Sequence, residues 1–237
     1  LIPEKFTLEN YVNGWKGFGK VTFSTFFKNS LVISVVATFG TVMASSLVAY
    51  GFARFQFKGK KILFTAMLLS MMLPAQVLMI PQYLWYQKLG WVGTYLPLIV
   101  PYFFAIQGFF VYLMSNFISG IPYELDEAAK IDGANKLKQI RYITLPLLKP
   151  MVILMLLMSI GKIFNSDFGL FYQVTLNQGL LTSTTQTIDT YVYRALMELN
   201  NIGMSSAASV FQAVLGFLLV VLSNAFVRVV DNDNALF

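Results

Sequence analysis

Four of the chain's 11 acidic residues lie within one polar segment, residues 118–146, which separates two strongly apolar stretches. Four basic residues share this segment, so both signs of charge are concentrated in a short part of the chain. A loop of that length is usually functional or disordered. Such a segment is suited to bind the surface of a partner protein through charge and close packing.

The spacing within the segment predicts helix rather than disorder. Pro122 followed by acids at Glu124, Asp126 and Glu127 is typical of a helix start, since acids favour the positive end of the helix dipole. Gly133 is placed to end that helix. A short helix therefore precedes the glycine, and polar residues remain on its surface.

The same helix has a small face at Ala128 and Ala129, which permits close approach by another protein, with Asp132 one turn further on. A second helix is expected from Asn135 to about Thr144, closed by a proline before the next apolar stretch. The alternative interpretation is a surface helix with no partner.

The chain lacks the residue types that most often bind metals or act as nucleophiles and bases. The sequence has neither Cys nor His, which removes thiolate sites, disulfides and the commonest general base. Gly14 to Lys20 matches the spacing of a phosphate-binding loop as far as the lysine, but Val21 stands where a magnesium-binding Ser or Thr is required. We therefore expect no catalytic residue, metal or cofactor site on this chain.

The elements that position the polar segment are apolar and long. Hydrophobic residues make up 57% of the chain and charged residues only 12%, about half the usual share for a soluble domain. A bilayer core about 30 Å thick needs about 20 apolar residues in a helix. Five stretches qualify, at residues 29–53, 62–80, 96–117, 147–164 and 207–229.

Lys and Arg residues predict the orientation of these spans. The loops at 54–61 and 118–146, with Lys149 just beyond the second, hold nine of them, against two in the loops on the other side. Positive loops face the cytoplasm. Residues 1–28 are then an outer surface segment and 167–205 an outer loop. The net charge of +6 is thus a topology signal, and no nucleic-acid partner is expected.

The start of the chain fits this orientation poorly. An outer N-terminus without a signal sequence or an initiator Met is unusual. We expect one further spanning helix before Leu1, with a cleaved leader as the alternative.

The polar segment resembles the loop signature of permease subunits of binding-protein-dependent ABC importers. The match consists of Glu127-Ala128-Ala129, three residues, Gly133, nine residues, Ile143, one residue and Leu145-Pro146. Its wider context is similar to the carbohydrate-uptake branch, and to the smaller permease subunit of maltose-type importers. Further matching residues are Lys28 to Ser30, Ala49 to Arg54, Met72 to Pro74, Pro81 and Tyr83.

This resemblance implies an all-α, polytopic membrane protein with the type I ABC importer permease fold, formed by residues 29–237 with six spans in a complete member. Loop 118–146 is then the coupling loop, which docks in a groove of an ATPase subunit. The residues implied for that contact are Glu127, Ala128, Ala129, Asp132 and Gly133. The implied partners are a second homologous permease, two ATPase subunits that hold ATP and Mg, and an extracellular sugar-binding protein.

The outer loop is implied to face the sugar-binding protein. The docking candidates there are Asn177, Thr184, Gln186 and Asp189. Sugar contacts need polar groups beside aromatic faces. The candidates for the substrate path are Gln107, Asn165, Tyr102 and Tyr172, although each is equally suited to helix packing.

The sequence therefore predicts a multi-pass subunit of an ATP-driven oligosaccharide or modified-sugar importer in a bacterial cell membrane. The alternative is a secondary carrier or channel that works without an ATPase. All 11 acids lie outside the predicted spans, which argues against a proton-coupled carrier but leaves a carbonyl-bound sodium site possible. A membrane-embedded enzyme is poorly equipped by this composition.

Overall fold

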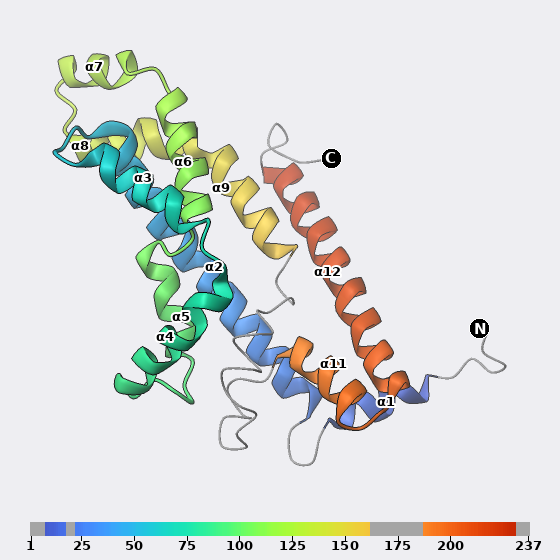
Figure 1. Ribbon diagram of the computed structural model, residues 1–237. Helices are drawn as coiled ribbons and strands as arrows, with labels where there is room; N and C mark the ends of the chain where they lie inside the picture. Colours follow the sequence, from blue (N-terminus) through green and yellow to red (C-terminus); the bar gives the residue numbers. More distant parts are fainter. Residues whose placement is uncertain (1–7, 18–21, 162–186, 231–237) are drawn as a thin grey trace. The chain divides into compact units, whose positions relative to one another are not determined.

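The computed structural model describes residues 8–17, 22–161 and 187–230, and every regular element in these ranges is helical (Figure 1). The predicted all-α fold is confirmed. In chain order the elements are α1 (Glu9–Lys16), α2 (Phe23–Arg54), α3 (Lys60–Ser70), α4 (Ala75–Lys88), α5 (Leu96–Ile99), the 3-10 helix η1 (Val100–Phe104), α6 (Gly108–Gly120), α7 (Glu124–Ile131), α8 (Lys136–Gln139), the π-helix η2 (Ile140–Thr144), α9 (Leu145–Ile160), α11 (Ile188–Met197) and α12 (Ile202–Val230).

Four helical stretches in the described ranges are long and apolar enough to cross a membrane. They correspond to four of the five predicted spans and comprise Phe23–Arg54, Leu96–Gly120, Lys136–Ile160 and Ile202–Val229. The second of these, Leu96–Gly120, contains α5, η1 and α6, and its helix is interrupted at Ala105, where φ is +53°. Breaks of this kind are tolerated in membranes where neighbouring groups satisfy the freed backbone.

The remaining predicted span, 62–80, is divided between α3 and α4. The helix ends at Ser70 because Pro74 has no N–H to donate to the Ser70 carbonyl, and its ring crowds the preceding turn. That carbonyl instead accepts from the Leu73 N–H at 3.2 Å. The stretch is apolar, as predicted, and its helix is interrupted between Ser70 and Ala75.

The chain divides into two compact units. The first contains the described parts of Leu1–Val36, Ala75–Ile99 and Ile160–Leu222. The second contains those of Ala37–Pro74, Val100–Ser159 and Ser223–Phe237.

Aromatic side chains around Tyr191 form the core of the first unit. Its ring meets Phe23 and Phe26 edge-on, with centroids 5.0 and 5.3 Å apart. Its hydroxyl donates to the Gly14 carbonyl at 2.7 Å, which ties α1 to α11. A methyl group at Gly14 would lie 3.2 Å from that hydroxyl, so only glycine leaves comfortable room for this contact.

Apolar side chains of α2, α6 and α9 form the core of the second unit. Its fully buried members include Met114, Ile118 and Met155. Close helix approach is visible at Gly40, where an added Cβ would lie 2.7 Å from the ring of Phe103. This core fixes the ends of α2, α6 and α9 that lie next to the polar segment.

We expect Tyr191→Phe to lower the free energy of unfolding by about 1 kcal/mol, because it removes the hydrogen bond to Gly14 and keeps the ring. Burial raises the pKa of Tyr191 to about 12, so the hydroxyl remains a donor at physiological pH. Since that pKa exceeds the unfolded value of about 10, the stabilisation is complete below pH about 10 and is lost as pH rises through 12.

Thermal unfolding in detergent measures this effect. Tyr11→Phe is the control, since Tyr11 lies on the exposed side of α1. Equal unfolding temperatures for the two variants would contradict the assignment.

Candidate functional site

The connection from α6 to α7 is an extended turn. Gly120 ends α6, Ile121 adopts an extended backbone, and Pro122 follows. The three acids of the first turn of α7 are Glu124, Asp126 and Glu127, as expected for the positive end of a helix dipole. A helix of eight residues is marginal on its own in water. Contacts with the rest of the second unit must therefore hold α7.

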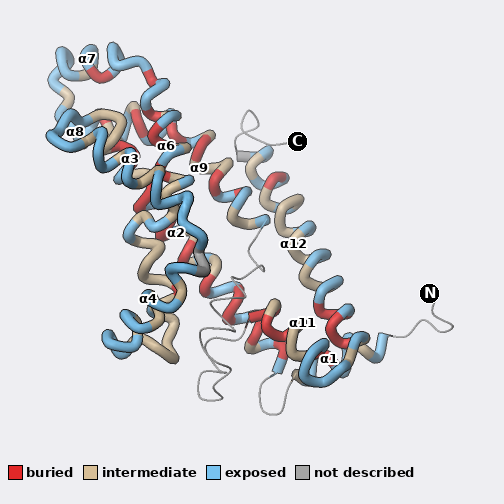
Figure 2. The backbone as a smooth tube through the Cα atoms, in the orientation of Figure 1, coloured by how far each residue is buried: buried red, intermediate tan, exposed pale blue. Residues whose placement is uncertain are grey.

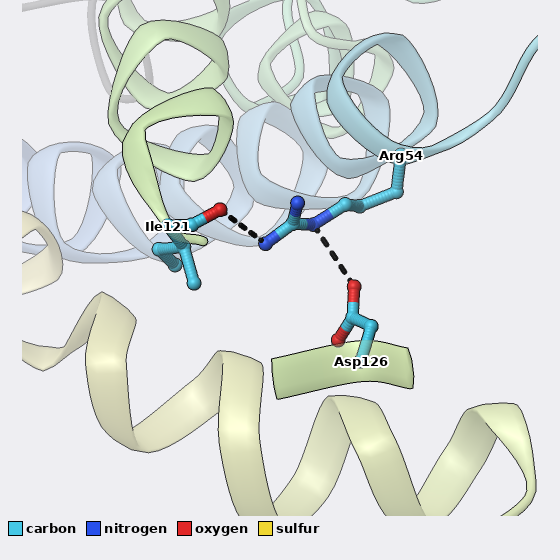
Figure 3. Close-up of polar contacts among 3 residues, drawn as sticks. All are labelled: Arg54, Ile121 and Asp126. Atoms are coloured by element: carbon cyan, nitrogen blue, oxygen red, sulfur yellow. Dashed lines mark hydrogen bonds and ion pairs between the residues drawn. The ribbon is translucent and has the colours of Figure 1, made fainter. Parts of the chain in front are cut away.

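Arg54, the last residue of α2, supplies those contacts (Figure 3). Its Nη2 donates to the Ile121 carbonyl at 3.1 Å, and its Nε lies 3.3 Å from Oδ2 of Asp126. The guanidinium carbon also lies 5.8 Å from the centre of the Tyr123 ring. One cation thus contacts the end of α6, the turn and the first turn of α7.

Both charged side chains of this pair are buried, with 6% of Arg54 and 4% of Asp126 exposed. A buried charge is costly unless it is paired, and removing one partner leaves the other uncompensated. The pair is therefore a strong constraint on where α7 lies relative to α2. Figure 2 shows the contrast, because α7 is otherwise mostly exposed.

Sequence reasoning did not find this pair. The sequence marked Arg54 as a loop charge at the end of a family-matching stretch, and Asp126 as a helix-start acid. The available signal was that α2 ends in an arginine, with no acid in the following loop at 54–61. A cation at the end of an apolar helix requires an anion from elsewhere, and the acids of 118–146 are the nearest concentration.

The residues predicted for coupling lie on the other sides of α7. Glu127, Ala128, Asp132 and Gly133 are exposed, and Ala129 is half-buried. Apolar side chains accompany them on the surface, at Leu125, Ile131 and Leu137, with Ile131 86% exposed. This mixed apolar and charged face is typical of a protein docking surface.

Gly133 makes the turn that ends α7, as predicted. Its φ is +78°, a conformation that side chains disfavour. The Ala134 N–H donates to Ala129 at 2.8 Å, and Asn135 caps α8 by accepting from the Lys138 N–H at 2.9 Å. A glycine turn therefore joins α7 to the start of the second helix.

The prediction that Pro146 closes the second helix is wrong. Helix continues from α8 through η2 into α9, which begins at Leu145. A π-helical turn at Ile140–Thr144 ends two residues before the proline. The wider turn relieves the clash between a proline ring and the carbonyl four residues earlier.

The other predicted site residues fall in several places. Asn165, Tyr172, Asn177, Thr184 and Gln186 lie outside the described residues.

Three of the predicted residues are described. Tyr102 lies in η1 and Gln107 precedes α6, both half-buried in the second unit. Asp189 lies in the first turn of α11, and its Oδ1 accepts from Nε2 of Gln212 at 3.0 Å. Their functional roles stay predictions.

The model of the family described as "Binding-protein-dependent transport system inner membrane component" matches residues 36–234. The chain belongs to this family. The polar segment and both helices joined by the Arg54–Asp126 pair lie within the matched range, apart from the start of α2.

The curated relatives that this chain matches are transport permeases. The chain is 37% identical over 150 residues to the trehalose/maltose transport system permease protein MalG of Thermococcus litoralis, covering 63% of the chain and 54% of the relative. It is 34% identical over 151 residues to the galactooligosaccharides transport system permease protein GanQ of Bacillus subtilis, covering 64% and 53%. The chain thus spans about half the length of these relatives.

Solved structures show the same fold. A bacterial ABC transporter involved in import of the acidic polysaccharide alginate superposes with a TM-score of 0.81 at 21% identity, covering 96% of this chain and 85% of that one. A bacterial alginate ABC transporter in complex with an alginate pentasaccharide-bound periplasmic protein gives 0.79 at 22%, covering 95% and 84%. The predicted ABC importer permease fold is confirmed.

We expect Asp126→Asn to loosen α7, because it leaves the buried Arg54 cation without its anion. A loss of about 2 kcal/mol would raise the open population about thirtyfold. Hydrogen exchange of the α7 amides measures that population. Glu124→Gln is the matched control, since it removes one exposed charge from the same first turn. Similar exchange in both variants would show that the pair does not hold α7.

Proposed function

We propose that this chain is a membrane permease subunit of an ATP-driven importer for oligosaccharides or modified sugars. The observation that carries the proposal is α7, a short helix with an exposed mixed face that a buried ion pair fastens to the end of a membrane-spanning helix. Family membership and relatives named for trehalose, maltose and galactooligosaccharides support it. They do not support a carrier or channel that works alone.

The partners follow from this role. A second homologous permease completes the path, two ATPase subunits bind ATP and Mg, and an extracellular sugar-binding protein delivers the sugar. The proposed location is a bacterial cell membrane, which the four apolar helical stretches of the described residues support. ATP hydrolysis belongs to the partner chains, so this chain is not an enzyme.

The docking face of α7 suits a groove on an ATPase subunit. Ala128 permits close backbone approach, Glu127 offers a charge, and exposed Ile131 offers apolar area. When ATP closes the ATPase pair, the groove displaces α7. The Asp126–Arg54 pair then passes the displacement to α2, since a helix moves as a rigid element. Nucleotide binding thereby shifts the population between inward-facing and outward-facing states.

The test of the proposal is reconstitution. Co-purification with an ATPase and a second permease, followed by ATP-dependent uptake of maltose, trehalose, galactotriose or alginate pentasaccharide into proteoliposomes, is the expected result. A stable transporter that needs no ATPase would contradict the proposal.

We expect Glu127→Ala to reduce uptake per ATP hydrolysed while leaving membrane insertion intact, because the docking face loses its charge. Gly133→Ala should do the same, since a positive φ costs a side chain about 1–2 kcal/mol. Gly120→Ala is the matched control, because an added Cβ there meets no atom within 4 Å and φ is not positive. Unchanged coupling in the Glu127 and Gly133 variants would contradict the docking role.

A further inference from the structure

Helix α12 presents three different faces within the first unit. One face packs on the Tyr191 core through Met204, Ala208 and Phe211. A second is apolar and exposed, with Val210, Val214 and Leu218 in line. The third lines a cavity. Its members are spaced as one helical face and comprise Ser209, Gln212, Ala213, Gly216, Phe217 and Val220.

The cavity has a volume of about 620 Å³, within the usual range of small-molecule sites. Its opposite side is formed by Asp189 and Val192 of α11 and by Gly161, which follows α9. Helix α11 is fixed there, because the Ser205 hydroxyl of α12 donates to the Val192 carbonyl at 3.0 Å. The walls formed by α11 and α12 are therefore held together within the first unit.

Polar groups meet in this cavity. Nε2 of Gln212 lies 3.0 Å from Oδ1 of Asp189, and the Ser209 residue is exposed one turn earlier on α12. Gln212 lies inside a stretch apolar enough to cross a membrane. Polar residues in such stretches face the bundle interior or a water-filled cavity and mark substrate pathways.

We propose that this cavity binds a sugar ring of the transported oligosaccharide. The inference rests on the proposed function and assigns this chain a direct part in substrate recognition. The Asp189 carboxylate, with several lone-pair sites, accepts hydroxyl hydrogens of the sugar, and the Gln212 amide both donates and accepts. Phe217 offers an aromatic face to the C–H face of the ring. Asp189, predicted from the sequence for binding-protein docking, acts here as a sugar ligand.

The two exposed faces of α12 differ in the way this assignment requires. Val210 and Val214 present only hydrocarbon, which suits lipid or a partner helix. On the cavity face, an added Cβ at Gly216 would meet no atom within 4 Å, so this glycine leaves open space rather than a packed contact. A sugar ring needs such space beside hydrogen-bonding groups.

The first test uses the absence of cysteine from this chain. Ser209→Cys and Val210→Cys place single thiols on neighbouring residues of the cavity face and the apolar face. In the assembled transporter, a small cationic methanethiosulfonate reagent should label Ser209→Cys faster than Val210→Cys. At least one of maltose, trehalose, galactotriose and alginate pentasaccharide should slow that labelling.

The second test is uptake of the same sugars with ATP. Gln212→Leu should reduce uptake about tenfold, the loss of one hydrogen bond to a polar ligand. Gly216→Leu should reduce it by filling the cavity. Val214→Leu, which adds a methylene on the apolar face, is the control and should transport normally.

Equal labelling rates of the two thiols would contradict the claim that the cavity is filled with water. Fast labelling that no sugar slows, or normal uptake by the Gln212 and Gly216 variants, would overturn the sugar assignment. None of these results concerns ATP-driven uptake by the unaltered transporter, which is measured separately. Failure of that uptake counts instead against the proposed function.

Discussion

A guanidinium buried at the end of a membrane helix is the constraint on which the rest of the account depends. Arg54 closes α2 with almost no exposed side-chain surface, so it requires an anion and acceptors from another part of the chain. Asp126 supplies the anion, in an ion pair at 3.3 Å, and the Ile121 carbonyl accepts one hydrogen bond. The position of α7 follows, because both partners lie in or just before its first turn. The exposed face of α7 is then a consequence, since its one buried side chain is already directed at α2.

The burial of Arg54 also explains how the few charged residues of this chain are distributed. Most of the described apolar surface belongs to helices that suit lipid, and the acids are kept outside the predicted spans. One acid of the polar segment, Asp126, is buried in the pair with Arg54. Glu127 and Asp132 remain exposed on the surface. Different residues of the same short helix therefore hold it against α2 and form its exposed docking face.

Local features of the site could be predicted from the sequence, because they depend on residues close along the chain. The acids at the start of α7 and the positive φ of Gly133 are examples. The pairing of Arg54 with Asp126 could not, since composition alone does not choose among the acids of the loop. The effect of Pro146 was also misjudged. Pro74 ends α3, whereas Pro146 is accommodated by the π-helical turn before it. Whether a proline breaks a helix depends on the turn that precedes it, which the apolar pattern does not reveal.

The most direct test of the account is a double-mutant cycle on the number of sugar molecules imported per ATP hydrolysed. Arg54→Met and Asp126→Leu are compared, alone and together, in the reconstituted transporter. If the pair fastens α7 to α2, each single variant loses coupling because it leaves a buried charge alone, and the double variant loses no more than either single one. Losses that add independently would contradict the claim that these two residues act as one fastening between the docking helix and the membrane.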